Sequence, residues 1–217
     1  MELAELVGVS AFLAVVSTGS VTVDIGTTWD NRPLSHGHAR VHLHQEQDRV
    51  IPVTLEADFF DDPAPPAGTE GQPLFGLWEY EVVELFILGE YDRYLELEFC
   101  PHGQHLVLLL KGEGNAIKHS LPLEFNATVE GGRWRGEARV PVSYFPATPD
   151  KLNAYAIHGC GENRQYEALF PAPQGAFDKP DFHRLKYFAH VNLEPLFKSD
   201  VGDVSDIWRQ ALDAPDH

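Results

Sequence analysis

The sequence is short of basic residues, and this shortage narrows the choice of partners. Lys and Arg number 16 against 33 Asp and Glu, which gives a formal net charge of −17 at pH 7 over 217 residues. A phosphate backbone and an anionic membrane surface both attract the opposite charge, and no run of Lys and Arg interrupts the acidity. We therefore expect no nucleic-acid partner and no membrane partner.

Cysteine and methionine are nearly absent. Cys100 and Cys160 do not form a CxxC pair, so the sequence predicts neither a structural zinc site nor a disulfide scaffold. One bridge between them stays open, but we expect two buried thiols in a reducing compartment. Met1 is the only methionine, so the chain offers no internal methionine as a haem ligand, and we expect no cofactor.

The N-terminal segment has few features of a leader peptide. Residues 7–16 are apolar, but Glu2 and Glu5 precede them with no Lys or Arg, which is the wrong charge for a signal peptide. The run is also too short to span a bilayer. We interpret residues 1–19 as a flexible or short helical extension, and we expect a cytoplasmic protein, with secretion as the alternative.

Short alternating runs rich in Val, Leu, Tyr and Phe dominate the rest of the chain, and Gly-rich turns separate them. The expected strands are Ser20–Ile25, Ala39–His44, Arg49–Ala57, Trp78–Leu88, Arg93–Cys100, His105–Leu110, Leu123–Val129, Arg133–Pro141, Ala154–Cys160 and Gln165–Phe170. This pattern predicts a mainly β fold, an antiparallel β-sandwich over residues 20–197.

Helices are expected only near the C-terminus. Asp181–His190 and Asp203–Leu212 each start with a capping Asp and carry apolar residues at helical spacing. The second lies in an acidic tail, residues 198–217, where an amphipathic helix usually packs on its own domain and less often binds a partner. The proline-rich loop at 61–73 is either functional or a cover over a sheet edge.

Glutamates interrupt the most strand-like segment of the chain. In an extended strand Trp78 and Glu84 share one face, while Glu81 faces the other side. At about 3.3 Å per residue, Trp78 and Glu84 would lie roughly 20 Å apart. They would meet around one ligand only if the ligand is extended or the strand bends.

The following strand adds more acid to the same face. If residues 78–88 and 93–100 form a hairpin through "GEYD", Glu96 and Glu98 crowd Glu84. Crowded carboxylates raise one another's pKa unless a cation, an arginine or a ligand hydroxyl lies between them. A solvated face is the first interpretation, and a sugar or metal site is the functional alternative. On a solvated face, the arginine partners of these carboxylates would be Arg93, Arg133 or Arg135.

Seven blocks of sequence closely resemble an uncharacterised protein family, number 0462. The blocks are "TWDNRP", "LWEYEVVELFIL", "YLELEFCPHGQHLVLLL", "SYFP", "AIHG", "YEALFPAP" and "KPDFHRLKYF". The resemblance covers residues 27–197 and implies a fold but no activity.

A more distant resemblance points to family 9 carbohydrate-binding modules and the related DOMON sandwiches. The shared pattern comprises Trp29-Asp30, then Trp78, Glu81, Val83, Glu84 and Phe86, then Pro101 and Gly103, then Trp134 and Glu137. By this resemblance Trp78 would stack on a sugar and Glu84 would accept hydrogen bonds from its hydroxyls. Those modules hold the ring between two tryptophans, and here Tyr166 or Phe170 would take the second place.

Histidines give the chain its other polar clusters. "SHGHARVHLH" contains His42 and His44 on one strand face, a spacing that zinc or copper can use, but such a surface cluster is more often incidental. The turn at "CPHGQH" would aim His102 and His105 at one pocket together with His158. We assign no metal ligand.

These observations predict a non-catalytic module for a saccharide or another small polar ligand. Its binding residues would be Trp78, Glu84, His102, His105, His158 and Tyr166. Two other functions stay open. One is a protein-interaction or scaffold domain that uses the 61–73 loop and the C-terminal helix. The other is a metal-assisted hydrolase that uses the three histidines with Glu84.

Overall fold

Alternation along the strands builds the first sheet of the molecule. In β2 (Ser20–Ile25), β4 (Ala39–His44), β5 (Val50–Asp58) and β11 (Arg133–Pro141), successive side chains are alternately buried and more exposed. Apolar residues such as Val21, Leu43 and Ile51 take the buried positions. The sheet therefore has one core face and one solvent face, as expected of an antiparallel sheet at the surface.

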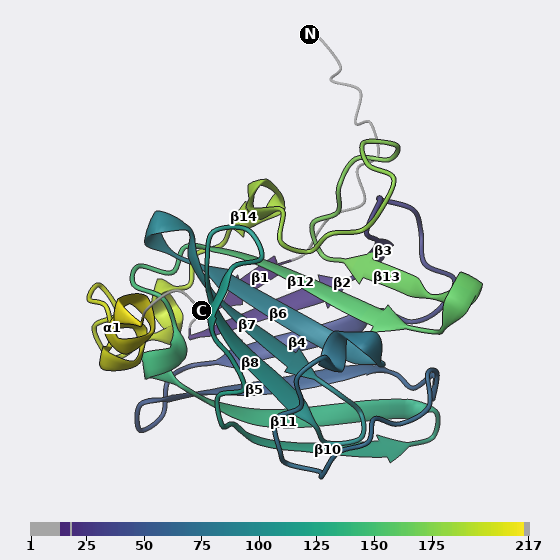
Figure 1. The fold of residues 1–217 in the computed structure, drawn as a ribbon, viewed down its shortest axis with the longest axis horizontal. Helices are drawn as coiled ribbons and strands as arrows, with labels where there is room; N and C mark the ends of the chain where they lie inside the picture. Colours follow the sequence, from purple (N-terminus) through teal and green to yellow (C-terminus); the bar gives the residue numbers. More distant parts are fainter. Residues whose placement is uncertain (1–13, 18, 215–217) are drawn as a thin grey trace, which may run out of the picture.

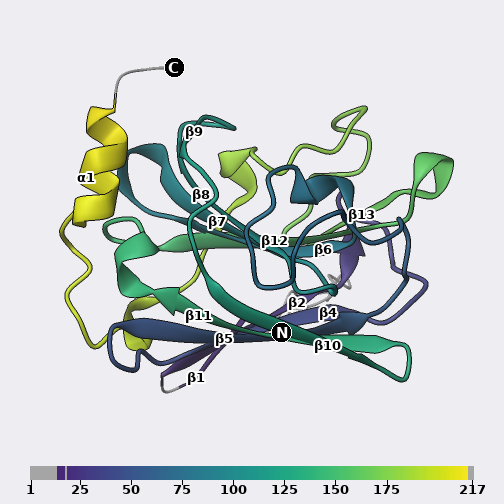
Figure 2. The same ribbon diagram turned by 60° about the horizontal axis from the view of Figure 1, so that its bottom comes forward.

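The computed structural model describes residues 14–17 and 19–214, and these form two antiparallel sheets that pack face to face (Figures 1 and 2). The first sheet has the order β1-β2-β4-β5-β11-β10, and the second has the order β3-β13-β12-β6-β7-β8-β9, with β14 beside β12. The remaining strands are β1 Ala14–Ser17, β3 Thr27–Thr28, β6 Val82–Leu88, β7 Arg93–Phe99, β8 His105–Lys111, β9 Ala116–Lys118, β10 Glu124–Glu130, β12 Lys151–His158, β13 Gln165–Ala168 and β14 Ala189–His190.

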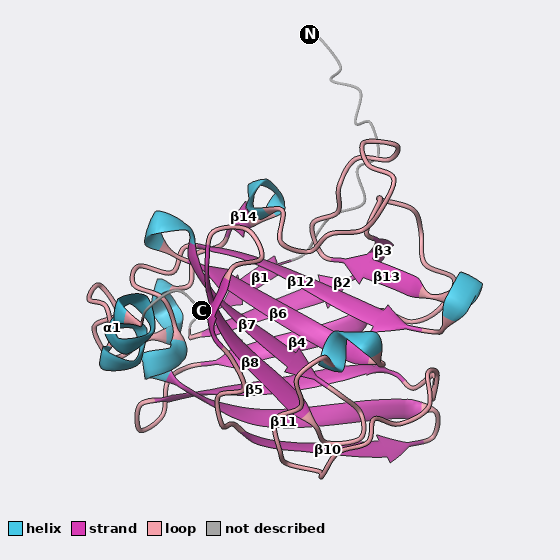
Figure 3. Cartoon of the chain, viewed as in Figure 1, coloured by secondary structure: helices cyan, strands magenta, loops and turns pink. Residues whose placement is uncertain are grey.

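The second sheet is buried on both faces. Every residue of β6 is buried, and β7, β8 and β12 are nearly as enclosed. The inner face packs against the first sheet and forms the main core. The outer face, which includes Phe86, Tyr94, Leu108 and Tyr155, lies under a layer of loops and forms a second apolar cluster. Figure 3 shows these loops over the sheet.

The predicted β-sandwich is confirmed, including its two clearest hairpins. Gly131 and Gly132 turn β10 into β11, with Glu130 opposite Arg133. The "GEYD" turn joins β6 to β7, with Glu84 opposite Glu98. The second hairpin is the condition on which the crowding of Glu84 with Glu96 and Glu98 depended, and the structure meets it.

The predicted helix at Asp181–His190 is wrong. The segment forms a 3-10 turn at Leu185–Tyr187 and then the short strand β14, which pairs with β12. Phe182 stacks flat on Tyr155, with ring centroids 3.9 Å apart. Covering the outer face of the second sheet thus favours a more extended path than the helical periodicity indicates, because the tertiary contact overrides the local preference.

The C-terminal helix α1 (Asp206–Asp213) is confirmed, and Ser205 rather than Asp203 occupies its N-cap position. The other 3-10 turns are Leu77–Glu79, Glu90–Asp92, Val142–Tyr144, Gly161–Asn163 and Glu194–Leu196. Within the described part of the chain, none of the helices is long and apolar enough to cross a membrane.

The predictions for the N-terminal extension and for the two cysteines agree with the structure only in part. Ala14–Ser17 of the expected N-terminal extension form β1 beside β2, and residues 1–13 and 18 lie outside the described residues. Cys100 is a buried free thiol as expected, but Cys160 is exposed. Cys160 follows the end of β12, where the chain has left the sheet.

Helix α1 packs on the sandwich through Trp208, which is 1% exposed and whose Nε1 donates a hydrogen bond to the carbonyl of Tyr144, 3.0 Å away. Trp208→Ala should lower the free energy of unfolding by about 3–5 kcal/mol, because it leaves a large cavity. Chemical denaturation would measure this change. The exposed neighbour Gln210→Ala is the matched control and should shift stability by less than about 0.5 kcal/mol. Equal stability of the two variants would show that the helix does not support the domain.

Candidate functional site

A cavity of about 550 Å³ opens on the outer face of the second sheet. Aromatic side chains form much of its wall, and two carboxyl groups from neighbouring strands form its polar floor. The wall includes Phe75, Trp78, Tyr166 and Phe182, and the floor includes Glu84 and Glu96. A largely apolar hollow with a few convergent polar groups is the usual form of a small-molecule site.

Trp78 reaches this cavity because the strand predicted at Trp78–Leu88 begins only at Val82. Residues Leu77–Glu79 form a 3-10 turn, so the chain bends before β6. Trp78 and Glu84 therefore line one hollow, and the roughly 20 Å separation expected of a straight strand does not apply. The bend is one of the two conditions under which the sequence allowed these residues to meet one ligand.

Arg164 fixes the turn that carries Trp78. Its guanidinium donates hydrogen bonds to the backbone carbonyls of Trp78 and Glu79, the second at 3.0 Å. The same group donates to the hydroxyl of Tyr166 at 3.1 Å. One arginine thus connects the two aromatic residues that sequence analysis selected, and it holds Trp78 through the backbone rather than through the indole.

The carboxyl groups of Glu84, Glu96 and Glu98 occupy neighbouring positions on β6 and β7. They are 2%, 4% and 0% exposed, so the expected solvated face does not exist. Within the described residues, none of the three forms an ion pair with a Lys or Arg. Of the expected partners, Arg133 binds Asp58 and Arg135 lies beside Glu56 on the other sheet, while Arg93 lies over the ring of Tyr91.

Burial raises the pKa values of these three groups, and repulsion from a neighbouring carboxylate adds to the rise at Glu84 and Glu98. Desolvation raises the pKa of Glu96 to about 8, and it raises those of Glu84 and Glu98 well above the usual range, with repulsion between the carboxylates adding to it. Oε1 of Glu84 and Oε2 of Glu96 have no hydrogen-bond partner. The cluster therefore holds protons near neutral pH, and its neutral carboxyl groups can both donate and accept hydrogen bonds.

His183 also lines the cavity, although the sequence did not mark it as a site residue. The hydroxyl of Tyr94 accepts a hydrogen bond from the backbone N–H of Gly114 at 2.9 Å and lies 2.8 Å from Nδ1 of His183. Burial lowers the pKa of His183. His183 and Phe182 both lie in the segment that was predicted as a helix. Their positions over the second sheet could therefore not be predicted.

The three histidines expected at the site lie elsewhere. His102 is 3.8 Å from Asp61, outside the cavity. His105 is fully buried on the inner face, against Phe125, and burial lowers its pKa to about 4. His158 lies on the inner side of β12, beside Glu167. The structure therefore unites Trp78, Glu84 and Tyr166, and does not assemble the quartet of the hydrolase alternative.

Proteins of similar sequence cover most of the chain. The UPF0462 protein C4orf33 homolog of Danio rerio is 46% identical over 186 residues, which span 83% of this chain and 94% of the relative. The UPF0462 protein C4orf33 of Homo sapiens is 45% identical over 186 residues, which span 83% and 93%. No protein-family model matches the chain.

Solved structures with a similar fold bear carbohydrate-related names. A Bacteroides uniformis ATCC 8492 protein, described as a candidate carbohydrate-binding protein, matches with a TM-score of 0.58 and 16% identity over 77% of this chain and 84% of that chain. A family 9 carbohydrate-binding module from Caldicellulosiruptor kristjanssonii, in complex with cellotriose, has a TM-score of 0.41 and 15% identity over 70% and 69%. The first match shows a shared β-sandwich fold and nothing about a ligand.

The buried carboxyl cluster should make the protein less stable as the pH rises. Unfolded glutamates lose their protons near pH 4.5, whereas the native cluster keeps protons until about pH 8. The native state thus binds more protons in this interval, so the free energy of unfolding should fall from about pH 4.5 to about pH 8. Urea denaturation at several pH values would measure the slope.

Glu98→Gln should flatten this slope, because it removes one group that ionises on unfolding. The free energy of unfolding of the variant should therefore fall less between pH 5 and pH 8 than that of the wild type. Glu98 does not line the cavity, so the variant tests charge burial apart from ligand contact. The exposed Glu137→Gln on the first sheet is the control for the general effect of net charge. The same slope in the two variants would contradict a cluster with raised pKa values.

Proposed function

The chain belongs to the UPF0462 protein family, and from the cavity on its second sheet we propose that it is a non-catalytic binding module for a small polyhydroxylated ligand. A saccharide or polyol is the proposed class. The observation that carries the proposal is the meeting of Trp78, Tyr166 and Glu84 around one hollow. Trp78 and Tyr166 provide flat apolar surfaces, and Glu84 provides a buried hydrogen-bonding group beneath them.

The chemistry of a sugar fits this arrangement. A pyranose ring presents an apolar face of C–H groups, which packs on an aromatic ring, and an edge of hydroxyls that donate and accept hydrogen bonds. A neutral carboxyl group at Glu84 or Glu96 can donate a hydrogen bond to one ligand hydroxyl and accept a hydrogen bond from another. Oε1 of Glu84 and Oε2 of Glu96 have no hydrogen-bond partner, so a ligand hydroxyl would supply the hydrogen bond that these buried atoms lack.

The cavity is also large enough for the proposed class. About 550 Å³ falls within the usual range of small-molecule sites. The proposal retains Trp78, Glu84 and Tyr166 from the sequence, adds Glu96 and His183, and leaves out His102, His105 and His158, which lie away from the cavity.

A small organic ammonium ion is a second candidate ligand, supported by one specific observation. Within the described residues the three buried carboxyl groups form no ion pair with a Lys or Arg. Arg164 lines the same cavity and offsets part of the rise that burial causes in the pKa of Glu84, and aromatic rings surround the carboxyl groups. Aromatic faces attract cations, and a bound ammonium group would supply the missing positive charge. Ionised carboxylates, rather than neutral carboxyl groups, would then be the binding form.

Titration calorimetry with a panel of saccharides, polyols and organic ammonium compounds tests the proposal. A saccharide or polyol should bind without being turned over. Trp78→Ala should weaken its affinity about 10- to 100-fold, since burial of such a side chain contributes about 1.5–3 kcal/mol. The arginine contacts to residue 78 involve its backbone carbonyl, so the variant retains the 3-10 turn.

The control is Tyr91→Ala, which removes a 74% exposed aromatic ring outside the cavity and should leave affinity unchanged. Glu84→Gln should also weaken binding. Equal affinities of the Trp78 and Tyr91 variants for every ligand, or no binding by any member of the panel, would contradict the proposal.

The pH dependence of affinity separates the two candidate ligands. A polyol that uses neutral carboxyl groups should bind less tightly as the pH rises toward and above 8. An ammonium ion should bind more tightly over the same interval, because the carboxylates ionise. Calorimetry at pH 6 and pH 9 on the ligand found above would measure the difference.

A further inference from the structure

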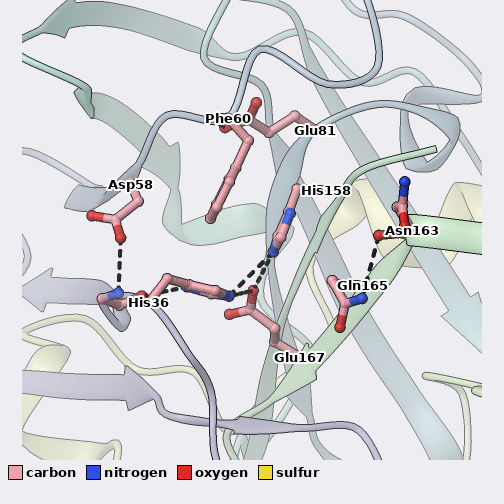
Figure 4. Close-up of polar contacts among 9 residues, drawn as sticks. His36, Asp58, Phe60, Glu81, His158, Asn163, Gln165 and Glu167 are labelled. Atoms are coloured by element: carbon pink, nitrogen blue, oxygen red, sulfur yellow. Dashed lines mark hydrogen bonds and ion pairs between the residues drawn. The ribbon is translucent and has the colours of Figure 1, made fainter.

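His36, His158 and Glu167 converge at one rim of the sandwich, away from the cavity described above. Nε2 of His158 lies 3.0 Å from Oε1 of Glu167, and Nε2 of His36 lies 3.3 Å from the same oxygen. The two Nε2 atoms are 3.3 Å apart. Figure 4 shows all three side chains directed at a common point.

The three groups come from segments that are far apart in the sequence. His158 ends β12 and Glu167 lies in β13, and both face the space between the sheets. His36 comes from the loop that leads into β4 of the first sheet. An atom bound to all three would therefore connect the first sheet's loop to two strands of the second sheet.

The local structure prepares His36 as an electron-pair donor. Its Nδ1 lies 2.9 Å from the carbonyl of Gly37, which can only accept, so Nδ1 carries the proton. In the neutral ring, Nε2 then presents its lone pair to Glu167 and His158. A hydrogen bond from the ring nitrogen away from the metal is the usual way in which proteins orient a ligating histidine.

The loop that carries His36 is itself held in place. The backbone N–H of Gly37 donates to Asp58 at 2.8 Å, and Arg133 binds the same carboxylate at 2.8 Å. A Cβ atom on Gly37 would lie 2.8 Å from an oxygen of Asp58, so a larger residue would displace this carboxylate from its hydrogen bond to the loop. Ordering of a ligand before binding lowers the entropic cost of binding.

Without a cation the cluster has too few donors. A neutral His158 can donate one hydrogen bond from Nε2, but Nε2 of His36 and Oε1 of Glu167 would still oppose each other as two acceptors at 3.3 Å. Glu167 is 2% exposed and His158 is 8% exposed, so water has little access. A second proton on His36, a proton on Glu167 or a metal ion resolves this conflict.

The spacing of the three atoms fits a metal ion. Bonds of about 2.0–2.1 Å to zinc place the ligand atoms of a tetrahedron about 3.3–3.4 Å apart. The observed separations are 3.0, 3.3 and 3.3 Å. A cavity of about 10 Å³ adjoins the cluster, which is space for roughly one water-sized atom.

We propose that His36, His158 and Glu167 bind one zinc ion, whose fourth position is taken by a water molecule in the adjoining small cavity. Two imidazoles and one carboxylate suit zinc, and three protein ligands with one open position are a known zinc arrangement. The ion links the loop before β4 to β12 and β13. It therefore stabilises the rim at which the two sheets meet.

The test uses the untagged full-length chain, stripped of metal by a chelator and then dialysed against zinc chloride. Elemental analysis should find about one zinc per chain, and zinc should raise the melting temperature. His36→Ala should bind zinc at least about 100-fold more weakly, because the loss of a ligand exceeds the 10- to 100-fold cost of losing an orienting partner. His36 lies in a partly exposed loop, so this variant should fold.

The matched control is the double variant His42→Ala/His44→Ala, which removes the other histidine pair on the same segment, with ring centroids 6.2 Å apart. It should retain zinc. Cobalt should give the visible absorption of a four-coordinate ion in the wild type and lose it in Glu167→Gln. Equal metal content in the wild type and His36→Ala, or loss of metal from the double variant instead, would overturn the proposal and leave a proton shared within the cluster as the explanation.

Discussion

Burial of the Glu84, Glu96 and Glu98 carboxyl groups is the constraint on which the second sheet depends. An isolated charge in an apolar interior is costly, so these groups hold protons near neutral pH and keep the outer face neutral. A neutral face can be covered by loops rather than by water. The apolar cluster that includes Phe86, Leu108 and Tyr155 can then form beside them.

The two candidate sites use opposite faces of the same strands. Along β13, Tyr166 points to the outer cavity and Glu167 to the inner rim, because successive side chains of a strand alternate. Along β12, Ile157 contributes to both hollows and His158 to the rim. A shift of β12 and β13 would therefore change the positions of side chains in both the outer cavity and the inner rim. The proposed zinc ion would hold the strand that carries Tyr166.

The sandwich was predictable because its information is local. Alternation of apolar residues sets the strands, and glycine pairs such as Gly131-Gly132 set the hairpins. The hairpin of β6 and β7 follows from the same rules, so the crowding of Glu84 with Glu98 was predictable too. The predicted helix failed where the outer layer decides the conformation. The segment 181–190 has helical spacing, yet it lies extended over Tyr155.

The sequence by itself determined the fold class and the buried alternation of the strands, and a resemblance to known modules pointed to Trp78, Glu84 and Tyr166. The tertiary structure decided their meeting, because a 3-10 turn held by Arg164 bends the chain before β6. It also decided that the carboxyl groups are buried, and that His36, His158 and Glu167 converge. These outcomes depend on contacts between residues up to 131 positions apart, from 36 to 167, which no local pattern encodes.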